Sequence, residues 1–475
     1  MKIKNEEINY LQIRRRDNIG ELFEYQGKIL RGIFPQATNM VRELLESGFV
    51  PELIEKNLFP DTWVTDYTSD NYGLIVEHER IWPIIYPQEW SFSMLKDAAL
   101  TVIKVAQVAR RYNYNMSDCH GYNILIDRNN PKYIDLGSFH TCQKGVTGWK
   151  AYEEFLRFYY YPLCTWKDGL EYTSKLSIFS ANLTPHVEHL MYHYPFLRSF
   201  SSELLSRLIK VRFLVSNLCC RSQDEVKQKQ KQKNAIGRAA LKLLKFLADH
   251  TNLAGSKNLA CLEKRIKSIK RKHTSSPWKN YQRGTSRKMA RFDRIIHLVN
   301  KFCPDIKTAI DMGGNRGLFA EKILEMTPVE KVICQDMDEQ AIDSGYNAHK
   351  NSLANISYVH FNAIAPIVKI TYPMPWERFC SDIVFALALL HHLILTQGFA
   401  LDTILQELAK YTNKYICVEF MPKGLWVQTD GSKITVPGWY TTDWFRQNFT
   451  KYFTLLTEEI VGENYIVFLG RKKGI

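Results

Sequence analysis

The sequence predicts a C-terminal α/β half with a mostly parallel, doubly wound sheet, preceded by an α+β half. Short apolar runs alternate with helical segments from about residue 308 onward, which is typical of parallel strands joined by crossover helices. A glycine-bearing turn follows the first of these runs, whereas residues 17–85 alternate like antiparallel strands. A chain of 475 residues with 45% hydrophobic content is long enough for two or three folded domains.

The stretch Thr308–Ala320 predicts a strand, a tight turn and the start of a helix that runs to about Met326. Such a unit presents backbone N–H groups and a positive helix end to a nucleotide-like ligand. Its spacing differs from the G-x-G-x-x-G dinucleotide fingerprint. A plain packing turn is the alternative. The polar and glycine positions that define the spacing are Asp311, Gly313, Asn315 and Gly317.

The next strands predict a row of polar residues at one edge of the sheet. Lys331–Cys334 leads to Asp336, about 20 residues beyond the glycine turn, where nucleoside-binding sheets hold ribose hydroxyls. Asp338 instead suits the N-cap of the following helix. The remaining predicted strands are Ile356–Phe361 before Asn362, Asp382–Leu390 before His391 and His392, Tyr415–Phe420 containing Glu419, and a closing hairpin within Thr454–Gly470.

The composition narrows the class of protein. A net charge of +14 permits a nucleic acid, an acidic glycan or an anionic surface as a partner, without choosing among them. Ten cysteines show neither zinc-type spacing nor a CxxC motif, so we expect reduced thiols in a cytoplasmic protein without a metal site. The first 17 residues lack the apolar core of a signal peptide, and no run reaches the length of a membrane span.

The N-terminal half contains a second polar constellation. A long helix, Ser93–Arg111, precedes Asp118, Asn123 and Asp135, with an apolar strand between the last two. This pattern resembles the catalytic and metal loops of protein-kinase-like folds, including the aminoglycoside phosphotransferases. The resemblance implies that Asp118 orients an acceptor hydroxyl and that Asn123 and Asp135 hold magnesium under the phosphates of ATP.

The match to the kinase-like pattern is incomplete. The chain shows no convincing glycine-rich phosphate loop, and Lys28 or Arg31 are only stand-ins for the usual strand lysine. Asp and Asn in a one-turn loop also form ordinary Asx turns. We therefore expect a degenerate kinase-like domain over residues 1–215. We favour a domain without kinase activity over an active kinase.

Residues 216–275 predict a basic helical linker. Lys227–Lys233 alternates lysine with glutamine, and Arg265–His273 is a second basic run. We favour the interpretation that these two runs are solvent-exposed helix faces. The alternative is that they form a patch that binds a polyanion. Just beyond this linker, we expect Trp278 and Tyr281 either to fold over a cofactor or simply to pack against the protein.

Several stretches together support a more specific resemblance. They are EWSFSMLKDAAL (Glu89–Leu100), Asp118–Asn123, YIDLGSF (Tyr133–Phe139), WKAYEEF (Trp149–Phe155), SPWKNY, DMGGNRG, and DIVFALALLHHL with VEFMPKG. The chain resembles two-part bacterial proteins of the nodulation-protein-like group, in which a kinase-like half precedes a class I S-adenosylmethionine (SAM) methyltransferase half. The resemblance covers nearly the whole chain except its lysine-rich middle. It implies a Rossmann-like methyltransferase domain over residues 276–475.

The resemblance also implies roles for the polar edge of the sheet. SAM is the expected cofactor, with contacts from Asp311, Gly313, Asn315, Gly317, Asp336, Asn362 and Ala386. His391 or His392 is the candidate general base, because histidine titrates near neutrality. A structural role for both histidines is the alternative. Glu419 is the second candidate base, or it bonds a backbone N–H or a substrate hydroxyl.

Three functions remain open from the sequence. The first is methyl transfer to an unidentified acceptor, with a glycan or small molecule favoured and the kinase-like half recognising it. The second is a bifunctional enzyme that phosphorylates, using Mg-ATP, and methylates one acceptor. The third is a nucleic-acid methyltransferase that docks through the basic middle segment.

Overall fold

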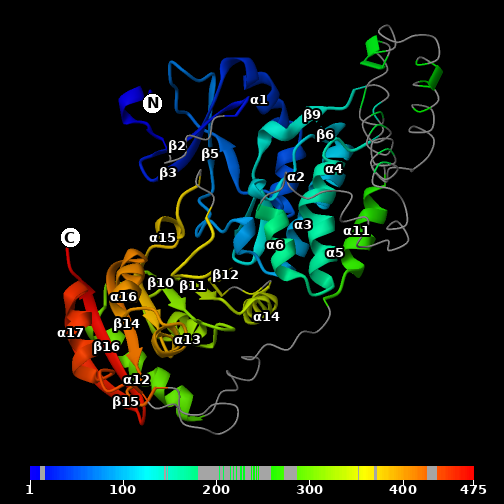
Figure 1. The fold of residues 1–475 in the computed structure, drawn as a ribbon. Helices are drawn as coiled ribbons and strands as arrows, with labels where there is room; N and C mark the ends of the chain where they lie inside the picture. Colours follow the sequence, from blue (N-terminus) through cyan, green and yellow to red (C-terminus); the bar gives the residue numbers. More distant parts are fainter. Residues whose placement is uncertain are drawn as a thin grey trace.

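The computed structural model describes residues 1–10, 17–143, 146, 148–179, 258–271, 286–350, 352, 354–368, 372–424 and 436–474, with isolated positions between 203 and 244. These residues form two halves that meet where helices α3 (Phe92–Arg111) and α14 (Glu339–His349) lie side by side (Figure 1). Most of the lysine-rich middle and the stretch Ser276–Tyr281 lie outside the described residues.

The N-terminal half begins with an antiparallel sheet. Its strand order is β1-β2-β3-β5-β4. Strands β2 and β3 form a hairpin that turns at Gln26 and Gly27, where φ is 50° and 77°, so both residues adopt the left-handed conformation that a two-residue hairpin requires. The elements are β1 (Asn9–Tyr10), β2 (Gly20–Tyr25), β3 (Lys28–Ile33), α1 (Thr38–Glu46), α2 (Phe49–Glu55), β4 (Thr62–Val64) and β5 (Leu74–His78).

Helix α3 is the centre of this half. Its apolar positions are spaced as the sequence predicted, and most of its residues are buried. Helix α11 (Leu259–Ser268), from the segment that the sequence assigned to a linker, packs on α3 through Leu262 and Ile266. The other elements are β6 (Tyr114–Met116), β7 (Ile124–Asp127), β8 (Asn130–Tyr133), β9 (Phe139–Thr141), α4 (Tyr152–Phe155), a π-helical stretch (Leu156–Tyr160), α5 (Tyr161–Lys167) and α6 (Glu171–Phe179).

The C-terminal half is a Rossmann-like mixed sheet of the methyltransferase type that the resemblance implies. Its order is β12-β11-β10-β13-β14-β16-β15. The pairings from β12 to β14 are parallel, and the expected closing hairpin β15–β16 is antiparallel. The strands are β10 (Thr308–Met312), β11 (Lys331–Asp336), β12 (Ile356–His360), β13 (Ser381–Ala386), β14 (Thr412–Phe420), β15 (Phe453–Gly462) and β16 (Tyr465–Lys472).

Helices cover both faces of this sheet. Helix α12 (Ser286–Phe302) stacks Phe292 on Phe319 of α13 (Leu318–Met326), and Phe319 meets Phe385 of β13. Helix α14 covers β11 and β12 on this face. On the opposite face, α16 (Leu401–Lys410) packs on α17 (Thr442–Tyr452), which stacks Phe445 on Phe420 of β14. A short helix, α15 (Pro375–Arg378), precedes β13.

The fourth strand of the sheet is shorter than the sequence predicted. It ends at Ala386 rather than Leu390, because Ala388 takes a positive φ of 50° and turns the chain. His392 therefore begins a π-helical segment, His392–Thr396, with His391 as its N-cap, and neither histidine ends a strand. Within the described residues, no helix combines the length and apolarity needed to cross a lipid bilayer.

Candidate functional site

A cavity of about 250 Å³ opens at the carboxyl-terminal edge of the C-terminal sheet. Ligands bind at this edge in open α/β sheets, where the strand order reverses. The reversal here lies between β10 and β13, the first and fourth strands of this half. The cavity is lined by Gly313, Asn315, Gln335, Asp336, Met337, Asn362, Ala363, Ile364, Ala388, Leu389, His392, Leu393, Thr396, Gln397 and Leu408.

The glycine turn forms one wall of the cavity. The N–H groups of Gly313 and Gly314 both donate to the Gln335 carbonyl, at 2.8 and 2.9 Å, which fixes the turn to the neighbouring strand β11. Asn315 has a φ of 53°, and its buried side-chain oxygen has no hydrogen-bond partner among the described residues. Because a buried acceptor without a partner is costly, this oxygen indicates a missing polar ligand or water.

Asp336 connects the glycine turn to the helix that follows. Its carboxylate accepts from the Asn315 N–H and the Asp338 N–H, each at 2.8 Å. Burial raises the pKa of Asp336 to about 6, against the opposing effect of these backbone donors. Asp338 caps α14, accepting from Gln340 N–H at 3.0 Å, as the sequence suggested. Asp336 is therefore the carboxylate that faces the cavity.

The opposite part of the cavity is largely apolar. Met337 is 52% exposed and lies beside Ile364, Leu389 and Leu393 in the cavity lining. Asn362 closes this part and accepts with its side-chain oxygen from Ile364 N–H at 2.9 Å and Ala365 N–H at 3.1 Å. This apolar slot, whose lining includes the Asn362 amide, suits an aromatic base.

A group of buried charges lies beneath the glycine turn, on the α12 and α13 face of the sheet. Asp311 pairs in register with Phe385, which pairs with Cys417, so Glu419 projects on the same face as Asp311. Arg291 of α12 reaches this group, with its Nε 3.4 Å from a Glu419 carboxylate oxygen. One oxygen each of Asp311 and Glu419, and Nε of Arg291, have no hydrogen-bond partner among the described residues.

The charge state of this group follows from its burial. Asp311 is 3% exposed, and burial with the nearby carboxylates of Asp336 and Glu419 raises its pKa to about 7. Burial also raises the pKa of Glu419, while Arg291 opposes that change. The other Glu419 oxygen accepts from Ala388 N–H at 2.9 Å and so holds the turn after β13. This contact is the backbone role that the sequence left open for Glu419, which does not line the cavity.

The two histidines differ in position. His392 lines the cavity, whereas His391 is 3% exposed and lies behind it, with the ring centroids 4.1 Å apart. Burial lowers the pKa of His391 to about 3 and lowers the pKa of His392. Both rings are therefore neutral near pH 7, and His392 is the one whose position permits contact with a bound ligand.

Four of the residues that the sequence proposed as cofactor contacts line the cavity in the structure: Gly313, Asn315, Asp336 and Asn362. Asp311 lies under the turn instead. Gly317 is the N-cap of α13 with a φ of 89°, a Cβ there would lie 2.4 Å from the Tyr358 hydroxyl, and the residue is not in the cavity lining. Ala386 is buried in β13, and Ala388 takes its place in the lining. Arg291 was missed, because an arginine in an amphipathic helix looks like a surface residue.

The three residues that the sequence compared with kinase loops, Asp118, Asn123 and Asp135, lie near Tyr133 in the chain, and the structure shows no kinase-like domain in the described part of this half. The Tyr133 hydroxyl donates to the Asp118 carbonyl at 2.8 Å, and the Ile134 N–H donates to the Asn123 carbonyl at 3.0 Å. Asp135 caps its own turn by accepting from Gly137 N–H at 2.9 Å, which is ordinary Asx chemistry. Asn123 Nδ2 is buried without a partner among the described residues.

The surroundings of these three residues show little phosphate-binding chemistry. Lys28 bonds to Glu77 at the end of a hairpin, and Arg31 pairs with Asp17. In the described part of the chain, no group of three or more His, Cys, Asp or Glu side chains is placed to hold a metal ion.

Comparison with known proteins gives a distant relative over most of the chain. Nodulation protein NoeA of Rhizobium meliloti (strain 1021) is 24% identical over 435 residues, which cover 86% of this chain and 84% of that protein. No family model matches the chain.

Solved structures resemble a smaller part. The PH0226 protein of Pyrococcus horikoshii OT3 (13% identity, TM-score 0.34) and a SAM dependent methyltransferase of Aquifex aeolicus (16%, 0.32) each match 42% of this chain over their whole length. The N-methyltransferase NodS of Bradyrhizobium japonicum WM9 (12%, 0.29) matches 42% of this chain and 99% of its own. At TM-scores this low, the likenesses add nothing to the fold that the strand order establishes.

Proposed function

We propose that this chain transfers a methyl group from SAM to an acceptor bound beside the cavity. The observation that carries the proposal is the cavity itself, which joins a glycine turn, the Asp336 carboxylate and an apolar slot at the edge of the sheet. These three features match a nucleoside: Asp336 suits the ribose hydroxyls, and the slot beside Met337 and Leu389 suits the adenine ring.

The buried charges beneath the turn match the remaining part of SAM. An amino-acid end carries an ammonium and a carboxylate. Beneath the turn, the Asp311 oxygen that has no hydrogen-bond partner among the described residues suits the ammonium, and the Arg291 guanidinium, which pairs with Glu419, suits the carboxylate. Buried groups with unmet hydrogen bonds are expected where a ligand completes them.

When bound, SAM supplies a methyl group that is already activated on its sulfonium. The contribution of this chain is alignment of the acceptor, which supplies up to about 7–11 kcal/mol in well-oriented reactions. The acceptor nucleophile gains the methyl group and loses a proton, and S-adenosylhomocysteine (SAH) leaves. His392, neutral and at the cavity wall, is positioned to take that proton, and His391 supports it from behind.

The acceptor that we propose is a glycan or a small molecule, recognised with help from the N-terminal half. In its described part, the basic middle segment makes internal contacts rather than a nucleic-acid-binding surface. Ile266 of α11 is buried, and Arg271 pairs with Glu339 inside the protein. Lys96 binds the carbonyls of Lys267 and Ile269, at 3.0 and 2.7 Å, so this run serves internal packing.

Calorimetric titration with SAH tests the cofactor before any acceptor is known. The wild-type chain should bind SAH, and Gly313→Arg should not, because Gly313 lines the cavity with a φ of 74°. Gly169→Arg is the matched control. Gly169 has a φ of 93°, a Cβ added there would have no atom within 4 Å, and the residue is absent from the cavity lining. A wild-type chain that does not bind SAH would refute the proposed function.

A second candidate function rests on the cluster around Tyr133. We propose Mg-ATP binding there only as an accessory activity, supported by the buried Asn123 Nδ2, which has no hydrogen-bond partner among the described residues. Titration of the full chain with Mg-ATP, with Asp135→Asn as the variant, tests it. Absence of binding at millimolar Mg-ATP would refute the proposal of a bifunctional enzyme. It would not bear on the proposal of methyl transfer.

A further inference from the structure

The turn Asp336–Glu339 belongs to the cavity on one side and to the contact between the two halves on the other. Asp336 and Met337 line the cavity. Asp338 is the N-cap of α14, and Glu339 is the first residue of that helix. The position of the Asp336 carboxylate is therefore fixed to the N-terminal end of α14, which faces α3 of the N-terminal half.

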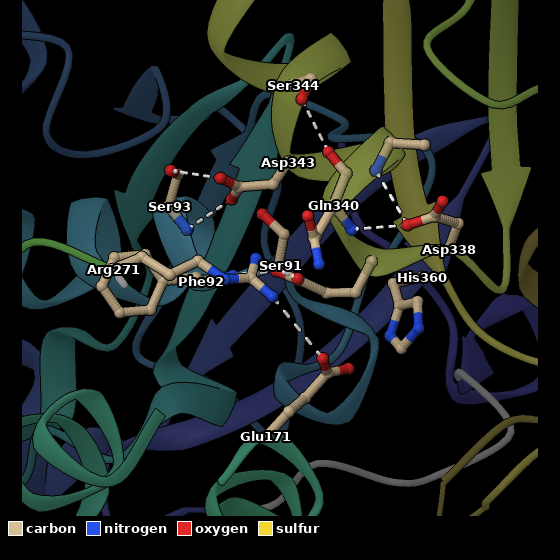
Figure 2. Close-up of polar contacts among 12 residues, drawn as sticks. Ser91, Phe92, Ser93, Glu171, Arg271, Asp338, Gln340, Asp343, Ser344 and His360 are labelled. Atoms are coloured by element: carbon tan, nitrogen blue, oxygen red, sulfur yellow. Dashed lines mark hydrogen bonds and ion pairs between the residues drawn. The ribbon is translucent and has the colours of Figure 1, made fainter. Parts of the chain in front are cut away.

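Two carboxylates of α14 cap the start of α3. Glu339, 3% exposed, accepts from Phe92 N–H at 2.8 Å and pairs with Arg271, which lies 3.7 Å from Glu171 of α6. Asp343, one turn further on, accepts from Ser93 N–H at 2.7 Å and from its hydroxyl at 3.0 Å (Figure 2). These N–H groups have no partner within α3, and the positive end of a helix favours acidic side chains. Burial and the nearby Asp343 nevertheless raise the pKa of Glu339 to about 7, while Arg271 opposes this change.

The imidazole of His360 makes a second connection between the turn and the N-terminal half. His360, at the end of β12, lies with Nε2 3.0 Å from the Met337 carbonyl, and its Nδ1 contacts Lys175 Nζ of α6. Burial and Lys175 hold the pKa of His360 well below its usual value, so the ring is neutral. Nε2–H then donates to the Met337 carbonyl, and Nδ1 accepts from the Lys175 ammonium.

We propose that Glu339, His360 and Lys175 are positioning residues for the cofactor, because they hold the turn that carries Asp336 and Met337. The inference rests on the proposed function. The contacts that Glu339 and His360 make and binding of the adenosyl group are then one coupled equilibrium. A turn held from outside presents the Asp336 carboxylate without further ordering on binding. Such coupling is reciprocal, so SAH must also tighten the hydrogen bond between Glu339 and the Phe92 N–H.

Calorimetry of the full-length protein with SAH tests the coupling. Glu339→Gln keeps the size of the side chain but removes its charge, and Lys175→Met removes the donor to His360. Each should weaken SAH binding about tenfold, a usual size for coupled sites. Asp343→Asn is the matched control, because Asp343 binds the same end of α3 but does not touch the turn. Its SAH affinity should stay within about twofold of wild type.

Hydrogen exchange gives a readout that a purely structural role would not move. Among the described residues, no residue of α3 lines the cavity. SAH should nevertheless slow exchange of the Phe92 amide in the wild-type protein, and Glu339→Gln should abolish this slowing. The inference is overturned if Asp343→Asn weakens binding as much as the other variants, or if SAH leaves the Phe92 amide unchanged.

The outcomes separate this inference from the proposed function. A wild-type chain that binds no SAH removes both. A wild-type chain that binds SAH, with Glu339→Gln and Lys175→Met binding equally well, removes only the coupling. Melting temperatures of all variants, measured without ligand, show whether a loss of affinity merely follows a loss of stability.

Discussion

At the scale of single residues, the site depends on carboxylates that are buried before any ligand arrives. Asp311 has one oxygen without a hydrogen-bond partner among the described residues, and burial raises its pKa from an ordinary 3.8 to about 7. The folded protein therefore holds a proton that the unfolded chain loses near pH 4. The free energy of unfolding falls as the pH rises through this window, because the unfolded state binds fewer protons there.

Asp311→Asn should remove this loss. The variant should become more stable than wild type as the pH rises from about 4 to about 7, by at most about 4 kcal/mol. Urea unfolding of the ligand-free proteins at several pH values measures the difference. Asp70→Asn is the control, because the side chain of Asp70 is 75% exposed and pairs with the exposed Lys2. A difference between Asp311→Asn and wild type that is independent of pH would contradict the prediction.

SAH binding should release protons near pH 6.5. The pKa of Asp311 is about 7 and that of Asp336 about 6, and a bound ammonium and ribose favour the ionised forms. The apparent binding enthalpy should therefore vary with the ionisation enthalpy of the buffer. Asp311→Asn should reduce this variation. Equal enthalpies in all buffers would count against ionisation of Asp311 on binding.

Sequence reasoning located part of this site and missed the rest for a physical reason. Glycine spacing and a carboxylate after a strand are local patterns, so Gly313 and Asp336 could be proposed from the chain alone, and both line the cavity. Arg291 meets Glu419 across more than a hundred residues, and no local pattern marks that contact. Glu419 was singled out, but only its hydrogen bond to Ala388 shows that it lies behind the cavity wall.

At the scale of elements, the strands were predictable and their ends were not. Apolar runs specified β10, β11, β12 and β14, because strands buried on both faces are continuously apolar. The end of β13 was misplaced, since the turn there is made by Ala388 in a left-handed conformation that alanine seldom adopts. The hairpin β15–β16 was found from its two apolar runs, and its partner strand β14 only from the structure.

The glycine turn makes a prediction at this scale. Gly317→Ala should cost about 2–4 kcal/mol of folding stability, from strain at a φ of 89° and from a Cβ placed 2.4 Å from the Tyr358 hydroxyl. Gly313→Ala, with its nearest contact at 3.4 Å, should cost about 1 kcal/mol but should weaken SAH binding. Urea unfolding and calorimetry measure the two effects. The reverse ranking would contradict the assigned roles.

At the scale of the whole molecule, the two halves share one continuous apolar core. A buried ion pair crosses it: Arg378 of α15 bonds to Glu89 at 2.9 Å and also contacts the Ile84 carbonyl at 2.5 Å. Both side chains are at most 3% exposed. We therefore expect the described halves to unfold as one cooperative unit rather than as two independent domains.

Arg378→Met should leave the Glu89 carboxylate buried without its partner and cost about 3–5 kcal/mol. Unfolding followed by circular dichroism and by tryptophan fluorescence should then give two separate transitions, where wild type gives one. Lys307→Met, which breaks an exposed pair with Glu330, should change stability by less than about 1 kcal/mol. Coincident transitions in Arg378→Met would show that the pair does not join the halves.

The capping of α3 by side chains of α14 has a consequence for protein engineering. The first backbone amides of α3 are satisfied by Glu339 and Asp343, about 250 positions later in the chain. A chimera that exchanges N-terminal halves between homologues would separate these amides from the acids that complement them. A successful exchange therefore needs to take Ser91–Ser93, Glu339 and Asp343 together from the same parent protein.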